Sequence, residues 1–135
     1  MVLEHEELTH EIIRAGIDVH RLLGPGFLEA IYSKAMGIEL RRRGLPFERE
    51  VKAPIRYRGI EVGRHRLDLL VAGKIVVELK AIRTIEDVHF AVVRSYLRAV
   101  GLRHGLLLNF ARPTLDARRV SAKLSFLAQP DAIPP

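Results

Sequence analysis

Residues 64–81 read RHRLDLLVAGKIVVELKA, and this stretch determines the expected fold. Two runs of alternating polarity, residues 64–71 and 75–81, flank the three-residue segment Ala72-Gly73-Lys74. This pattern predicts a β-hairpin whose loop contains a glycine for a left-handed position. If Val71 faces Ile75, then Asp68 faces Glu78 across the two strands, and a two-residue turn would break this geometry.

Alternation along the two strands gives the hairpin two faces of different chemistry. One face is wholly apolar and must be buried; it consists of Leu67, Leu69, Val71, Ile75, Val77 and Leu79. The other face carries the polar groups and consists of Arg66, Asp68, Leu70, Val76, Glu78 and Lys80. We therefore expect the polar cluster to be fixed to a rigid scaffold.

The polar cluster suggests a metal site. Two carboxylates that face each other on a sheet repel unless a cation lies between them, and their oxygen atoms suit Mg²⁺. Lys80 points the same way, and its ammonium group beside a metal can orient or deprotonate a water molecule. Asp68, Glu78 and Lys80 therefore indicate metal-assisted hydrolysis of a phosphodiester. The alternative is a solvent-facing hairpin on which Lys80 forms an ordinary cross-strand ion pair.

The remaining segments surround this hairpin with helices and further strands. Helical spacing predicts helices over residues 4–23 and 28–43, and period-two alternation from Pro46 predicts a strand with Pro54 at an edge or a bulge. A helix is expected over residues 85–100, capped by Thr84, followed by a short buried strand at residues 106–108 that runs to Asn109 and Phe110. Residues 114–127 fit either a short helix or a strand. We predict one domain over residues 1–128 and a proline-rich tail over residues 129–135.

Composition excludes several classes of protein. The 135 residues contain no cysteine, which excludes a disulfide framework and a thiolate metal site. No apolar run approaches the roughly 18 residues that suggest a membrane span, and the N-terminus lacks the pattern of a secretory signal, so we expect a cytoplasmic protein. The net charge is +6, and 17 of the 22 basic residues are arginine. This excess would attract a polyanion such as nucleic acid, although a general preference for arginine codons explains it equally well.

Two further segments bear on the class of protein. The heptapeptide Gly26-Phe27-Leu28-Glu29-Ala30-Ile31-Tyr32 has the form GxxExxY, and Asp68 with Glu78-Leu79-Lys80 has the form D…ExK. With these motifs and Asn109-Phe110 after a buried strand, the chain resembles the GxxExxY family of the PD-(D/E)xK nuclease superfamily. The resemblance covers roughly residues 8–120. It implies an α/β fold with a restriction-endonuclease-like core, a mixed β-sheet flanked by helices in the order α-α-β-β-β-α-β.

The resemblance also implies roles for individual residues. Asp68 and Glu78 would hold Mg²⁺, with Mn²⁺ as a substitute, Lys80 would assist the attacking water, and Glu29 would complete the acidic site. The substrate would be nucleic acid, with DNA favoured over RNA, and a homodimer is an open expectation. Candidate nucleic-acid contacts are Arg66, His89 and Tyr96, the last two on one face of a helix because they are seven residues apart.

One position departs from the family pattern. Such proteins commonly carry a glutamine four residues before the aromatic residue of the helix, and Val92 occupies this position here. The departure supports a second hypothesis, in which the chain keeps the nuclease fold as a catalytically lapsed module that binds nucleic acid or a partner. A third hypothesis is a protein-interaction subunit whose positive charge only aids solubility.

Overall fold

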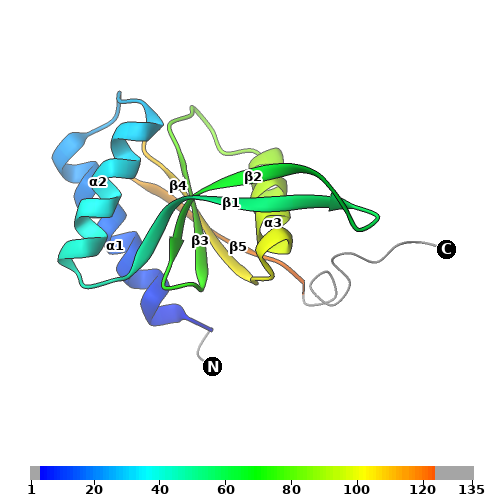
Figure 1. Ribbon diagram of the computed structural model, residues 1–135. Helices are drawn as coiled ribbons and strands as arrows, with labels where there is room; N and C mark the ends of the chain where they lie inside the picture. The colour runs from blue at the N-terminus through cyan, green and yellow to red at the C-terminus, as the bar shows by residue number, and fades with distance from the viewer. Residues whose placement is uncertain (1–3, 124–135) are drawn as a thin grey trace.

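The computed structural model describes residues 4–123, in which a five-stranded sheet lies between two helical layers (Figure 1). In chain order the elements are α1 (Glu6–Leu23), α2 (Glu29–Arg42), β1 (Phe47–Tyr57), β2 (Ile60–Val71), β3 (Ile75–Lys80), α3 (Asp87–Val100), β4 (His104–Asn109) and β5 (Asp116–Ser121). The predicted order is confirmed, and β5 adds a strand where the sequence allowed either a helix or a strand. The predicted tail, residues 129–135, lies outside the described residues.

The sheet is mixed, and its strands follow the order β1-β2-β3-β4-β5. Strands β3 and β4 are parallel, with Ile75 opposite His104 and Lys80 opposite Asn109, and all other neighbours are antiparallel. A parallel pair needs a long crossover, which α3 provides. Helices α1 and α2 pack on one face of the sheet and α3 on the other (Figure 1).

Strand β3 is buried on both faces. Ile75, Val77 and Leu79 pack in the core beneath α1 and α2, whereas Val76 is fully buried in a second core beneath α3. The face that carries Glu78 is therefore covered by a helix. The alternative of a solvent-facing hairpin is wrong for β3, because helices flank both of its faces.

The predicted register of the β2–β3 hairpin is confirmed. Val71 pairs with Ile75, and the loop between them contains Ala72 and Gly73 at positive φ angles of 54° and 64°. Strand β2 begins at Ile60, four residues before the predicted start, and its first part pairs with β1. Strand β1 lies at the edge of the sheet, which explains how it accommodates Pro54.

One part of the predicted apolar face packs in a different core. Leu69 and Val71 belong to the core beneath α1 and α2, whereas Leu67 packs with the residues beneath α3. The change occurs at Asp68, where the β1–β2 ladder is interrupted between its Arg49–Leu69 and Val51–Leu67 pairs. The hairpin twists strongly at this point, so one continuous strand face passes from one core to the other.

The start of α3 differs from the prediction. The helix begins at Asp87 and its N-cap is Glu86, so Thr84 does not cap it. The Glu86 N–H donates to His89 Nδ1 at 2.8 Å, which satisfies a backbone donor at the helix start. The predicted start was two residues early because local sequence offers two polar residues that could cap the same apolar pattern.

Tyr32 fixes the turn between α1 and α2. Its side chain is fully buried and stacks on Phe110 with ring centroids 4.4 Å apart. Its hydroxyl donates to the Gly24 carbonyl at 2.7 Å and accepts the Phe27 N–H at 3.2 Å. Gly26, with φ 112°, adopts a conformation in this turn that favours glycine. Together these contacts define where α2 begins and therefore where Glu29 lies.

We expect Tyr32→Phe to lower the free energy of unfolding by about 1–3 kcal/mol, because it removes the partner of two backbone groups in a partly buried turn. Urea denaturation would measure the change. Tyr57→Phe is the matched control, since Tyr57 is 65% exposed and should change stability by less than about 0.5 kcal/mol. Equal effects of the two substitutions would show that the Tyr32 hydroxyl does not hold the turn.

Candidate active site

Glu78 lies near the carboxyl end of β3 and is only 5% exposed. Its Oε2 atom is 3.4 Å from the Tyr96 hydroxyl of α3 and 3.5 Å from the Lys80 ammonium. Both distances are long for hydrogen bonds. Oε1 is buried and has no hydrogen-bond partner among the described residues. A buried carboxyl group with one unpartnered oxygen is costly unless it is protonated or binds a cation.

Asp68 reaches the same place from β2. Pairing between β2 and β3 ends at Leu69 and Val77, so the ladder no longer provides a partner for the Leu79 N–H. Asp68 Oδ2 accepts this N–H at 2.9 Å. The twist that ends the strand pairing thus turns the Asp68 carboxylate toward β3, beside Glu78.

Electrostatics at this pair favour a proton or a metal ion. Burial and the neighbouring Asp68 carboxyl raise the pKa of Glu78 to about 8, and these effects exceed the opposing effect of Lys80. Burial, together with the Glu78 and Asp68 carboxyl groups, raises the pKa of Tyr96 to about 12. Tyr96 therefore remains a neutral hydroxyl that can donate to Glu78.

Glu29 and Asn109 fix the chain where it leaves β3. Glu29, at the first turn of α2, accepts the Ala81 N–H at 3.1 Å through Oε2. Asn109 is fully buried; its Oδ1 accepts the Ile82 N–H at 3.0 Å and its Nδ2 donates to the Ile82 carbonyl at 2.8 Å. Sequence analysis gave Asn109 no role of its own. The available signal was a polar residue at the end of a continuous apolar strand.

Tyr96 has a second set of contacts that the sequence did not reveal. The His65 ring from β2 meets the Tyr96 ring edge-on, with centroids 4.5 Å apart, and His65 Nε2 lies 3.0 Å from Ser95 Oγ. Ser95 Oγ donates to the Val92 carbonyl at 2.8 Å, so it accepts its other hydrogen bond from His65. Burial and the positive charge of Arg98 lower the pKa of His65. His65 thus supports the residue that contacts Glu78.

Arg66 and His89 lie differently. Arg66 is exposed and forms an ion pair with Glu50 on the neighbouring strand β1. The His89 ring is engaged at the start of α3 through its contact with the Glu86 N–H. The structure therefore brings together Asp68, Glu78, Lys80 and Tyr96. Glu29 lies close by, because it binds the N–H of Ala81, the residue that follows Lys80. Nucleic-acid contacts of Arg66, His89 and Tyr96 stay predictions.

The donor set fits a hard divalent cation. Asp68 and Glu78 offer carboxylate oxygens, one of them the unpartnered Oε1 atom. Within residues 4–123 no group of three or more acidic or histidine side chains is placed to hold a metal ion. Mg²⁺ often takes only one or two carboxylates from the protein and completes its shell with water and substrate phosphate. Two protein ligands are therefore sufficient for this ion.

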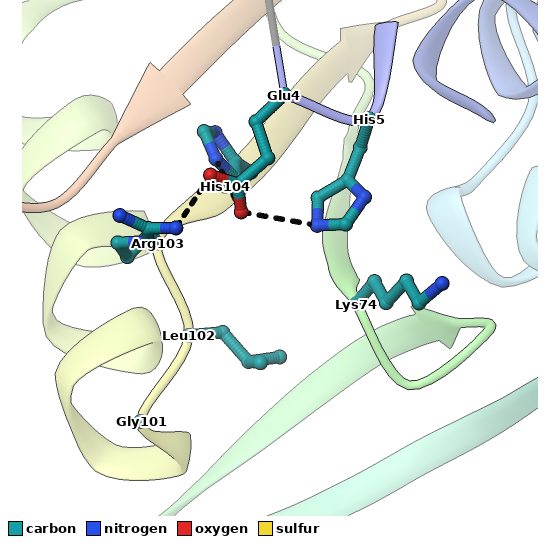
Figure 2. Close-up of a pocket in the computed structure, with 7 residues that line it drawn as sticks. All are labelled: Glu4, His5, Lys74, Gly101, Leu102, Arg103 and His104. Carbon is teal, nitrogen blue, oxygen red and sulfur yellow. Dashed lines mark hydrogen bonds and ion pairs between the residues drawn. The ribbon is translucent and has the colours of Figure 1, made fainter. Parts of the chain in front are cut away.

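A separate hollow lies at the opposite end of β3 (Figure 2). Its lining includes Lys74, from the loop before β3, and His104, the first residue of β4. Glu4 forms ion pairs there with His5, Arg103 and His104. Because Glu78 and Lys80 lie at the other end of β3, this hollow is not part of the carboxylate site.

Comparison with known families identifies the class of protein. The model of the PD-(D/E)XK nuclease superfamily matches residues 6–120, and the chain belongs to this superfamily. Its members are generally nucleases that act on nucleic acid and typically use divalent metals. Comparisons with curated proteins and with solved structures give no significant match. No helix among the described residues is long and apolar enough to span a membrane.

The raised pKa of Glu78 predicts a pH-dependent stability. Between an unfolded pKa near 4.5 and a folded pKa of about 8, the metal-free folded state binds more protons than the unfolded state. Its free energy of unfolding should therefore fall as pH rises through this interval, by a few kcal/mol at most. Glu78→Gln, which stays neutral, should be the more stable protein at pH 8 and should lose most of this dependence.

Urea denaturation in the presence of a chelator, from pH 4.5 to 8.5, would measure both effects. Glu48→Gln provides the control, since Glu48 is exposed and its substitution should leave the pH profile unchanged. A profile that is the same for Glu78→Gln and the parent protein would show that Glu78 ionises normally in the folded chain.

Proposed function

We propose that this protein is a metal-dependent nuclease that hydrolyses phosphodiester bonds, with DNA as the preferred substrate. The observation that carries the proposal is the buried Glu78 carboxyl, with one unpartnered oxygen, beside Asp68 and Lys80. Membership of the nuclease superfamily supports the same reaction. A carboxyl pair that served only stability would be expected to have its oxygens hydrogen-bonded.

Asp68 and Glu78 would hold Mg²⁺, or Mn²⁺ as a substitute. The ion would polarise the phosphoryl group and lower the pKa of a water molecule. Asp68 Oδ2 is already bound to the Leu79 N–H, so its other oxygen would be the one that binds the ion. Tyr96 holds Oε2 of Glu78 and leaves Oε1 for the cation.

Lys80 has a different task. Its side chain is 23% exposed, and its ammonium lies 3.5 Å from Glu78 Oε2, so it can contact both the carboxylate and an incoming substrate. We assign it the orientation of the attacking water and the stabilisation of negative charge on the phosphate. Glu29 supplies a further carboxylate at the end of β3, held by the Ala81 N–H, and acts as an additional acid.

We further infer that the chain is of the GxxExxY type. Each residue of that pattern has a distinct physical task here, which supports the assignment. Gly26 adopts a positive φ in the turn, Tyr32 clamps the same turn, and Glu29 reaches the end of β3.

Val92 supports the alternative of a lapsed module that binds nucleic acid or a partner without cutting. It is half-buried and lies four residues before Tyr96, hence on the same side of α3. A valine there supplies no polar group to the site. Binding of metal by Asp68 and Glu78 separates the two functions.

Metal binding and cleavage should respond differently to substitution of Asp68 and of Lys80. Asp68→Asn should weaken Mg²⁺ binding about tenfold or more, because a neutral amide oxygen is a poorer partner for a hard dication. Lys80→Ala should retain metal binding and lose cleavage by about a hundredfold or more, because it removes a group that acts on the reacting atoms. Titration calorimetry with Mg²⁺ and Mn²⁺, with cleavage measured on the same preparations, tests both statements. Unchanged metal affinity in Asp68→Asn would remove Asp68 from the ligand set.

The activity itself is tested on circular duplex DNA, linear duplex DNA, single-stranded DNA and RNA with Mg²⁺ or Mn²⁺. We expect metal-dependent cutting of DNA that is absent in an identically prepared Glu78→Ala protein, a control that excludes a contaminating nuclease. Metal binding without cleavage of any substrate would favour the lapsed module.

A further inference from the structure

The β1–β2 hairpin forms an arm that leaves the sheet at the candidate site. Strand β2 pairs with β3 only over Leu69–Val71, so residues 51–67 pair only with one another. Figure 1 shows this two-stranded arm passing α3 and projecting beyond it. The arm packs on α3 through Ala53, His65 and Leu67.

The arm has a net positive charge. Residues 51–66 contain five lysine or arginine residues and one glutamate, a net charge of +4 against +6 for the whole chain. All five basic side chains are exposed: Lys52, Arg56, Arg58, Arg64 and Arg66. Such a concentration of charge attracts a polyanion and repels a second copy of the same arm.

Three of these cations form a row along one face of the arm. Alternation places Arg64 and Arg66 on one face of the arm, opposite the face on which His65 and Leu67 pack against α3. On the neighbouring strand, Lys52 lies directly opposite Arg66, a like-charged pair that is unfavourable unless an anion lies close to it. Arg64 and Arg66 form ion pairs with Glu61 and Glu50, but exposed pairs of this kind contribute little and exchange readily for phosphate.

The tip of the arm presents apolar side chains next to these charges. Tyr57, Ile60 and Val62 are 65%, 68% and 63% exposed. The turn between the strands places Arg58 and Gly59 at positive φ angles of 50° and 78°. A positive φ is unfavourable for arginine, yet it holds the Arg58 guanidinium 5.8 Å from the centre of the Tyr57 ring.

We propose that the β1–β2 arm binds duplex DNA next to the scissile phosphodiester, with its cationic row on the backbone phosphates and its tip in the groove. From Asp68 to Gly59 the strand spans about 30 Å at 3.3 Å per residue, close to nine base pairs of B-DNA. The major groove of B-DNA admits a two-stranded ribbon, whereas that of A-form RNA is deep and narrow. The arm therefore favours duplex DNA, and the proposal rests on the nuclease function given above.

The test compares two double variants that remove the same charge. Lys52→Gln with Arg58→Asn alters the arm, and asparagine suits the positive φ at position 58, so the turn is retained. Arg14→Gln with Lys34→Gln removes two exposed cations from α1 and α2 as the control. Both are made in a Glu78→Gln background, so that binding to a fluorescent 20-base-pair duplex is measured by anisotropy without cleavage.

We expect the arm variant to lose about tenfold or more in affinity and to lower the slope of log K against log salt by about 1.8, with the control nearly unchanged. Equal behaviour of the two variants would overturn the proposal. So would sedimentation showing that the parent protein dimerises through the arm and the arm variant does not. Hydrolysis of bis(p-nitrophenyl) phosphate by proteins with Glu78 intact separates the two proposals, because this small diester does not extend from the site to the arm when it is bound. If only the arm variant loses this hydrolysis, the arm acts on the site and not on DNA. If no protein hydrolyses the diester but the arm variant still loses DNA affinity, the nuclease function alone is refuted.

Discussion

Strand β3 is covered on both faces by helices, and this constraint determines where the polar groups of the site can lie. A strand in this position is expected to be apolar throughout, and Ile75, Val76, Val77 and Leu79 satisfy that expectation. Glu78 is the exception, and its carboxyl is held between Lys80 on the same strand and Tyr96 on α3. The charge of Glu78 is therefore unfavourable until a cation is bound. The carboxylate that would bind a metal ion thus lowers the stability of the metal-free protein.

The twist at Asp68 connects the site to the rest of the molecule. It ends the pairing of β2 with β3, frees the Leu79 N–H for the Asp68 carboxylate, and directs the remainder of β1 and β2 away as an arm. A flat continuation of the sheet would satisfy Leu79 through the ladder and would leave Asp68 beside another strand. The same backbone distortion thus positions a candidate metal ligand and separates a cationic surface from the core.

Much of this arrangement follows from local sequence. The hairpin register depends on a three-residue loop and on alternation, both of which are visible in residues 64–81, and so the approach of Asp68 to Glu78 was predicted. The burial of Glu78 was not, because it depends on α3 packing over the face that carries Val76. The twist that sends Leu67 into the second core, and the supporting contacts of His65 and Asn109, likewise arise between segments far apart in the chain. The choice of Glu86 over Thr84 as the helix cap belongs to the same class, since Asn109 fixes the chain at Ile82, two residues before Thr84.

The burial of Glu78 determines when the candidate site can bind a metal ion. Burial is the largest cause of the raised pKa of Glu78. Near neutral pH the carboxyl is then mostly protonated, and a metal ion can bind only as that proton leaves. Metal affinity should consequently rise with pH through about 8, in contrast to a site whose carboxylates are ionised in advance. The raised pKa of Glu78 is thus compatible with a functional site, at the expense of metal affinity at low pH.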